Sequence, residues 1–138
     1  MLYTFHDIMV VAQTVFGEAR NQSMEGQRAV AHVINNRLND RRWPNEFKNV
    51  CHQPKQFSCW NKNDPNLLVI SLVPFDDPVF RRCFWISAKV MAGDDTDNTS
   101  GANHYHSPTI SAPIWAEDRF KTTRIGDHIF YNIPPLGT

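Results

Sequence analysis

The first 40 residues carry apolar side chains at three- and four-residue intervals, and this spacing constrains the fold more than any other feature. It predicts one helix over roughly residues 5–19 and a second helix that Ser23 can cap and that ends before Pro44. The apolar faces of the two helices consist of Ile8, Val11, Ala12, Val15 and Ala19 and of Val30, Val33, Ile34 and Leu38. Because such faces are buried against each other, the chain begins as a helical core.

The rest of the chain predicts one more helix and a small C-terminal β-hairpin. Asp77 and Pro78 are suited to start a helix that Gly93 ends, whereas prolines interrupt residues 41–75, which we expect to form a long structured loop. Gly126-Asp127 separates two β-type runs and is a turn of the kind that joins hairpin strands. These elements predict a mostly helical α+β fold, with one domain over residues 1–138.

The net charge of the chain limits the kinds of molecule that it is suited to bind. The chain carries 14 Lys and Arg against 14 Asp and Glu, so its formal net charge at neutral pH is zero. This balance does not favour nucleic acid or an anionic membrane, whereas an uncharged polymer is a compatible partner. No apolar run approaches the roughly 20 residues that span a bilayer, and the first residues lack the pattern of a signal peptide. We expect a monomer without membrane insertion.

Three cysteines, Cys51, Cys59 and Cys83, are too few and too irregularly spaced for the disulfide framework of a small secreted domain. We expect three reduced thiols, with Cys83 in the core. A bridge between Cys51 and Cys59 remains the alternative.

Glu18 is the candidate catalytic residue because it lies where the apolar face of the first helix ends. A carboxyl group in that position can be partly desolvated and still be reached by a substrate, and desolvation raises a carboxyl pKa as a general acid requires. The competing interpretation is a solvated residue at a helix end. Glu25, seven positions later, is a possible supporting carboxylate that tunes Glu18 or caps local structure.

Two further segments combine amide, hydroxyl and aromatic groups, the mixture that binds sugars by stacking and hydrogen bonding. Either segment could instead be a loop anchored in the core by its aromatic rings. The candidate substrate-binding residues are Gln56, Phe57, Ser58 and Trp60 in the first segment and Tyr105 and His106 in the second, with His104 as a possible supporting residue.

A zinc site is the main rival to a carboxyl-based mechanism. His104, His106 and His128, with Asp127 or a cysteine, could hold zinc with an open position for amide or peptide hydrolysis. However, the chain has no His-Glu-x-x-His helix, and its cysteines are not paired at metal-binding spacing. We expect no metal and no other cofactor.

Several ordered blocks together resemble the spore-cortex-lytic, SleB-type cell-wall hydrolases over nearly the whole chain. The blocks include Gly17-Glu18-Ala19-Arg20, Glu25-Gly26-Gln27, Asn35-Asn36-Arg37, Gln56-Phe57-Ser58-Cys59-Trp60, Gly101-Ala102-Asn103-His104-Tyr105-His106 and Ile125-Gly126-Asp127-His128-Ile129-Phe130-Tyr131. The resemblance implies a lysozyme-like domain that cleaves peptidoglycan glycan strands, generally as a lytic transglycosylase. It also implies that Glu18 is the acid/base, whereas Asn21-Gln22 stands where the family often has Gly-Glu.

By this resemblance, Glu18 would protonate the oxygen between N-acetylmuramic acid and N-acetylglucosamine, and would then accept the C6 hydroxyl proton as a 1,6-anhydro ring closes. No second carboxylate is needed. Gln56 and Ser58 would hold polar groups of the glycan, Trp60 and Tyr105 would line the cleft, and a histidine would orient the substrate.

The biological setting that fits these expectations is a phage endolysin made in the cytoplasm and released to the cell wall, or an enzyme carried in a virion. Two other classes stay open: a zinc amidase or peptidase that cuts peptidoglycan stems, and a non-catalytic glycan-binding module.

Overall fold

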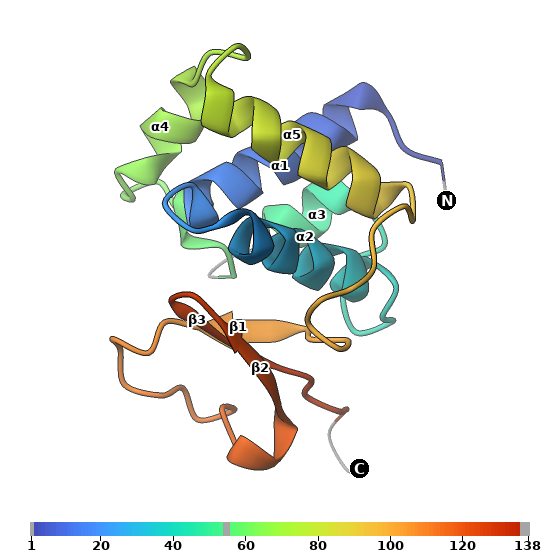
Figure 1. Cartoon of the computed structure of the whole chain (residues 1–138), viewed down its shortest axis with the longest axis vertical. Coiled ribbons are helices and arrows are strands. Elements are labelled where there is room, and N and C mark those ends of the chain that lie inside the picture. Colours follow the sequence, from blue (N-terminus) through green and yellow to red (C-terminus); the bar gives the residue numbers. More distant parts are fainter. Residues whose placement is uncertain (1, 54–55, 136–138) are drawn as a thin grey trace.

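The computed structural model describes residues 2–53 and 56–135, which form a helical layer above a small sheet (Figure 1). The helical layer comes first in the chain and the sheet last. In chain order the elements are α1 (Phe5–Ala19), α2 (Met24–Leu38), α3 (Phe47–Cys51), the 3-10 helix η1 (Ser58–Trp60), α4 (Asn66–Leu72), α5 (Pro78–Met91), β1 (His104–His106), the 3-10 helix η2 (Asp118–Phe120), β2 (Lys121–Ile125) and β3 (His128–Tyr131).

The three long helices begin at residues with side chains that cap them. Thr4 and Asp7 form a reciprocal capping box at the start of α1. The Ser23 hydroxyl accepts a hydrogen bond from the main-chain N–H of Gly26, and Asp77 accepts two such bonds at the start of α5. The expected helix starts are therefore confirmed, and the mostly helical α+β fold with them.

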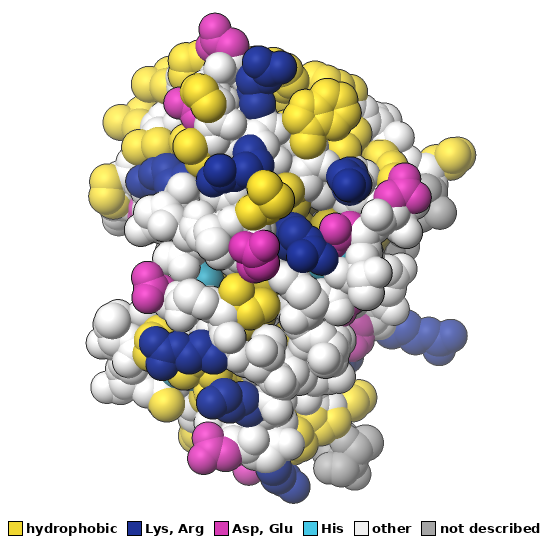
Figure 2. All heavy atoms as spheres, in the orientation of Figure 1, with side chains coloured by type: hydrophobic (Ala, Val, Ile, Leu, Met, Phe, Trp, Pro, Cys, Tyr) yellow, Lys and Arg dark blue, Asp and Glu magenta, His cyan; other side chains and the backbone are white. Residues whose placement is uncertain are grey.

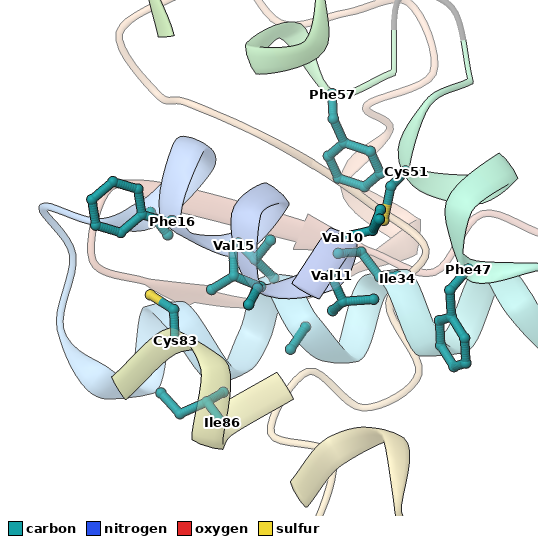
Figure 3. Close-up of a cluster of buried hydrophobic side chains, with 14 of the residues drawn as sticks. Val10, Val11, Val15, Phe16, Ile34, Phe47, Cys51, Phe57, Cys83 and Ile86 are labelled. Atoms are coloured by element: carbon teal, nitrogen blue, oxygen red, sulfur yellow. The ribbon is translucent and has the colours of Figure 1, made fainter. Parts of the chain in front are cut away.

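The main core lies where α1, α2 and α5 meet, with α3 against one side (Figure 3). Val11 and Val15 of α1 and Ile34 of α2 are fully buried there, and Ile86 of α5 closes the cluster. Burying each such side chain stabilises the fold by about 1.5–3 kcal/mol, so the apolar spacing accounts for the helical layer.

The expectation of a loop over residues 41–75 is wrong in part, because α3, η1 and α4 lie within it. These elements contain 5, 3 and 7 residues, too few to show a helical period in the sequence. Tertiary contacts fix them instead. Phe47, Val50 and Cys51 of α3 and Ile70 of α4 are buried in the main core.

The sheet has three antiparallel strands in the order β1-β3-β2. The predicted hairpin is β2 and β3, and Gly126 at its turn has a φ of 55°, which favours glycine. The sequence did not predict β1, which pairs with β3 so that His104 lies opposite Tyr131 and Tyr105 opposite Phe130. A three-residue strand shows too little alternation to be recognised.

The loop between α5 and β1 ties the sheet to α2. Asp95 accepts hydrogen bonds from Arg28 and lies 2.7 Å from a ring nitrogen of His32, while Asn36 donates to Asp97 at 3.0 Å. Beneath this polar network lies a second, smaller apolar cluster made of Ala29, Val33, Ala102 and Phe130. The position of β1 relative to the helices is therefore fixed from two sides.

Cys51, Cys59 and Cys83 are all buried free thiols, as expected. Burial raises the pKa of the Cys51 thiol to about 12, so this group stays protonated. The alternative bridge between Cys51 and Cys59 is not formed.

The surface mixes charges of both signs. On the face that Figure 2 shows, Lys and Arg side chains alternate with Asp and Glu rather than gathering in one patch. Within residues 2–53 and 56–135, no helix is both long enough and apolar enough to cross a bilayer.

Candidate active site

Glu18 lies in the last turn of α1, half-buried and facing β1. The hydroxyl group of Tyr105 donates a hydrogen bond of 2.6 Å to Oε1 of Glu18. The Tyr105 ring is held in turn by the rings of His128, at 4.7 Å between centroids, and Phe130, at 5.5 Å. Tyr105 therefore reaches the carboxyl group from a fixed position on the sheet, and its oxygen is bonded to Glu18 rather than free for a sugar.

Cys59 of η1 contacts Glu18 from the other side. Its main-chain N–H and its thiol lower the pKa of the Glu18 carboxyl group, because they favour the carboxylate. Gly17 permits this approach, because a Cβ atom there would lie 2.7 Å from Cβ and 2.8 Å from Sγ of Cys59. The glycine that precedes the candidate acid is thus explained by close packing of η1 against α1.

Burial has the largest effect on the pKa of the Glu18 carboxyl group. Loss of water raises the pKa of this carboxyl group, and the negative charge of Asp64 raises it further. Hydrogen bonds from Tyr105 and Cys59 act in the opposite direction, because they stabilise the carboxylate. The net pKa is raised, so Glu18 can hold a proton at a higher pH than an exposed glutamate and can still become a stabilised anion.

Arg37 is the main site residue that the sequence did not indicate. It is buried on α2, and its guanidinium donates to the main-chain oxygen of Asn103 at 2.7 Å and to Oε1 of Gln56 at 3.1 Å. Burial lowers its pKa to about 10, while Tyr105 and Glu18 lie close enough to favour its charge. Arg37 is therefore a cation at neutral pH that connects β1 to the segment holding the candidate sugar contacts.

The segment from Gln56 to Trp60 divides between core and surface. Gln56 and Ser58 are exposed and Trp60 is half-buried, with its indole N–H donating to Thr14 at 2.9 Å. Phe57 is only 2% exposed and belongs to the core. This burial corrects the expectation that Phe57 binds substrate, since its ring offers no free face.

The histidines of β1 belong to an aromatic cluster. The His104 ring packs against Trp43 and Trp115, and burial lowers the pKa of His104 to about 4, so it is neutral at physiological pH. His106 is buried, and its ring nitrogens lie 2.8 Å from the Ser107 main-chain oxygen and 3.0 Å from the Tyr131 hydroxyl. Its polar atoms already have protein partners, so the structure gives His106 a structural role rather than a place at the substrate.

The residues proposed for the rival zinc site do not come together as a metal site. Among the residues that the structure describes, no group of three or more His, Cys, Asp or Glu side chains is placed to hold a metal ion. His128 packs on Tyr105, whereas His104 packs on Trp115. His106 also packs on Trp115, so His104 and His106 share one aromatic cluster while His128 lies with Tyr105.

Glu25 does not accompany Glu18. Its side chain is exposed in the first turn of α2, and its main-chain oxygen accepts a hydrogen bond from Asn98. The carboxylate that acts electrostatically on Glu18 is Asp64, which follows η1. Spacing along the chain therefore indicated the wrong second carboxylate.

Glu18 is a half-buried acid at the end of a helix, it faces a small antiparallel sheet, and the fold is lysozyme-like. The fold matches the catalytic domain of the Bacillus cereus SleB protein with a TM-score of 0.77 and 28% identity, over 95% of this chain and 93% of that chain. It also matches the catalytic domain of the germination-specific lytic transglycosylase SleB from Bacillus anthracis, with a TM-score of 0.76 and 29% identity, over 94% and 97% of the two chains.

The chain belongs to the cell wall hydrolase family, which it matches over residues 21–131. It is 35% identical to the spore cortex-lytic enzyme of Halalkalibacterium halodurans. The 130 aligned residues are 94% of this chain and 36% of the relative. The spore cortex-lytic enzyme of Bacillus subtilis is 32% identical, over 93% of this chain and 38% of the relative. The chain thus spans little more than a third of these two relatives. Glu18 precedes residues 21–131, which the family match covers, and its place in the site comes from the geometry above.

Proposed function

We propose that this domain cleaves the glycosidic bond between N-acetylmuramic acid and N-acetylglucosamine in peptidoglycan, as a lytic transglycosylase. The observation that carries the proposal is the Glu18 carboxyl group, which burial keeps protonated to a higher pH and which Tyr105 contacts at 2.6 Å. The family relationship supplies the cell wall as substrate.

In the first step, protonated Glu18 gives its proton to the glycosidic oxygen while the bond from that oxygen to C1 of the muramic sugar breaks. The released sugar leaves with a new hydroxyl group. Positive charge develops on the ring and is stabilised by the sugar's own acetamido oxygen. The hydrogen bond from Tyr105 stabilises the Glu18 carboxylate that this step creates.

In the second step, the C6 hydroxyl oxygen of the muramic sugar bonds to C1, and the Glu18 carboxylate accepts the proton that this hydroxyl loses. The product has a 1,6-anhydro ring, and Glu18 is protonated again. No water is consumed. Arg37 remains charged and holds Gln56, whose exposed amide is available to polar groups of the glycan.

The decisive experiment is mass spectrometry of the fragments that the wild-type protein and Glu18→Gln release from purified peptidoglycan. Wild type should release muropeptides with anhydro ends, one water lighter than hydrolysed products, and the variant should be slower by at least about 100-fold. Reducing muramic ends would show hydrolysis instead of ring closure. Cleavage of stem peptides that a chelator abolishes and Glu18→Gln retains would establish the zinc alternative, and binding without release would establish a glycan-binding module.

We also propose a bacteriolytic role, as a phage lysis enzyme that reaches the wall from the cytoplasm through a membrane lesion, or from a virion. Two observations support this proposal: the chain belongs to a cell wall hydrolase family, and its zero net charge suits an enzyme that reaches a polysaccharide from solution. Cytoplasmic expression should lyse cells only when a pore-forming protein is expressed with it, as turbidity would record. Light scattering should show a monomer.

A further inference from the structure

The two ring nitrogens of His104 have different surroundings. Nδ1 lies 2.8 Å from Oδ1 of Asn103. Within residues 2–53 and 56–135, Nε2 has no hydrogen-bond partner, and it is not one of the buried side-chain atoms that lack a partner. Because the His104 side chain is only half-buried, Nε2 is open to solvent and to a ligand.

The neighbours of Asn103 determine which nitrogen of His104 carries the hydrogen. The main-chain N–H of Ile133 donates to Oδ1 of Asn103 at 2.9 Å, and Nδ2 of Asn103 donates to the main-chain oxygen of Ile133 at 3.0 Å. Oδ1 is thus an acceptor, so the hydrogen of the contact with His104 lies on Nδ1. Burial, and then the charges of Arg37 and Arg42, lower the pKa of His104 to about 4. The ring is therefore neutral, and Nε2 is an unprotonated acceptor.

Trp115 supplies an aromatic surface beside this nitrogen. Its ring is half-buried, and its centroid lies 4.7 Å from that of His104. Trp43 packs on His104 at 5.7 Å, but the guanidinium groups of Arg37 and Arg42 lie over the Trp43 ring, at 5.3 and 4.7 Å from its centroid. Trp115 therefore offers indole surface to a ligand, whereas Trp43 supports the histidine.

We propose that His104 and Trp115 form a further glycan-binding subsite, in which Nε2 of His104 accepts a hydrogen bond from a hydroxyl or acetamido N–H group of a sugar that stacks on Trp115. An aromatic face with one fixed polar atom beside it is the combination that orients a sugar ring. The N-acetylated sugars of peptidoglycan carry both kinds of donor. This inference rests on the proposed cleavage of peptidoglycan and adds a contact away from the scissile bond.

The subsite lies next to the proposed cleavage site but is separate from it. His104 and Tyr105 are consecutive on β1, and successive side chains of a strand point to opposite faces of the sheet. Tyr105 contacts the catalytic carboxyl group, so His104 lies on the other face. Because β1 is at the edge of the sheet, a glycan strand that passes along this edge can reach both residues.

Asparagine and glutamine separate the roles of the two nitrogens of His104. In His104→Asn the side-chain amide can donate to Asn103 from near the position of Nδ1, but it does not reach the position of Nε2. In His104→Gln the amide oxygen reaches the position of Nε2, and the hydrogen bond to Asn103 is lost. A merely structural histidine predicts that only the glutamine variant is impaired. The subsite predicts that glycan binding is impaired in the asparagine variant and retained in the glutamine variant.

The test is isothermal titration calorimetry with a soluble tetrasaccharide of alternating N-acetylglucosamine and N-acetylmuramic acid that carries no stem peptides. All proteins carry Glu18→Gln, so that the glycan is not cut. Adding His104→Asn should raise Kd by about 3- to 10-fold, the effect of one hydrogen bond, whereas His104→Gln should stay within about 2-fold. Trp115→Leu should also weaken binding by about 3- to 10-fold. His6→Asn is the matched control, since His6 is exposed on α1, and its Kd should not change.

Unchanged affinity in His104→Asn, or a loss confined to His104→Gln, would overturn the subsite. If the asparagine variant does not fold, nitrogen-15 NMR of the His104 ring decides. The hydrogen should lie on Nδ1, and the Nε2 signal should shift when the tetrasaccharide is added. A hydrogen on Nε2, or an Nε2 signal that does not respond, contradicts the inference.

These measurements need no turnover, whereas release of anhydro muropeptides tests the proposed function. Normal release together with binding that does not depend on His104 would overturn the subsite alone. Binding that depends on His104 without any release would support the subsite and overturn the proposed cleavage.

Discussion

Gln22 and Asp127 bind each other through two hydrogen bonds that join the turn after α1 to the tip of the hairpin. Nε2 of Gln22 donates to Oδ2 of Asp127 at 3.1 Å, and the main-chain N–H of Asp127 donates to Oε1 of Gln22 at 3.1 Å. A primary amide offers a donor and an acceptor at once, so it satisfies both groups. The family's frequent glutamate at position 22 would offer acceptors alone when ionised.

Replacing Gln22 by Glu should therefore weaken the junction of the two layers. The new carboxylate would face that of Asp127 and lose one hydrogen bond, which should lower the free energy of unfolding by about 1–2 kcal/mol in urea denaturation at neutral pH. Adding Asp127→Asn to this variant restores a donor and should recover most of the loss. Equal stability of wild type and the single variant would show that the pair contributes nothing.

Replacing Glu18 by Gln should make the domain more stable at neutral pH. Because the folded-state pKa of Glu18 lies above its unfolded value, its contribution is fully present at low pH and is lost as pH rises through the folded pKa. A glutamine has no charge to bury. The stability difference between the variant and wild type, measured by thermal unfolding, should grow with pH across that window, and a constant difference would contradict the raised pKa.

Arg37→Lys should be costly although it conserves charge. A lysine cannot reproduce the fork that holds both Asn103 and Gln56, and it leaves a buried main-chain oxygen without its donor. We expect a loss of about 1–3 kcal/mol in the free energy of unfolding. Turnover should fall as well, because β1 and Gln56 lose their common support. The matched control is Arg41→Lys, since Arg41 is exposed, and its unfolding should match that of wild type.

Gly17→Ala should separate η1 from α1. The added methyl group would lie 2.7 Å from Cβ of Cys59 and 2.9 Å from Cγ2 of Ile70, closer than such carbon atoms pack. Overpacking of this kind costs about 1–3 kcal/mol, measurable in urea denaturation, and the displaced Cys59 should lower turnover too. Adding Cys59→Gly removes one of the clashes and should recover part of the stability but not the activity. Wild-type activity in Gly17→Ala would contradict the close contact.

Periodicity in the sequence predicted the helices and the hairpin because those elements are long enough to repeat a pattern. It also predicted that Glu18 is partly buried, since its carboxylate stands where an apolar face ends. The short elements, α3, η1, α4 and β1, carry too few residues for any period to emerge. Their positions depend on contacts between residues far apart in the chain.

The residues around Glu18 show the same limit of prediction from sequence. Asp64 rather than Glu25 acts on it, because distance in space does not follow spacing along a helix. Arg37 has the spacing of a core position, but charged side chains are rarely fully buried, so the pattern gave no reason to expect it in the site. Cys59 was considered as a reduced thiol, a disulfide partner or a zinc ligand, and nothing local in the sequence shows that it packs against the helical turn that carries Glu18.

Tyr105 reaches Glu18 across 87 positions of sequence. During synthesis, α1 emerges before β1, and its carboxyl group has no hydroxyl partner until β1 has been made and has docked beside the loop that Asp95 and Asp97 hold on α2. The pairing of β1 with β3 further requires the chain as far as Tyr131. A fragment that ends before β3 would therefore carry the acid without its setting, so a competent site forms only after β3 has left the ribosome.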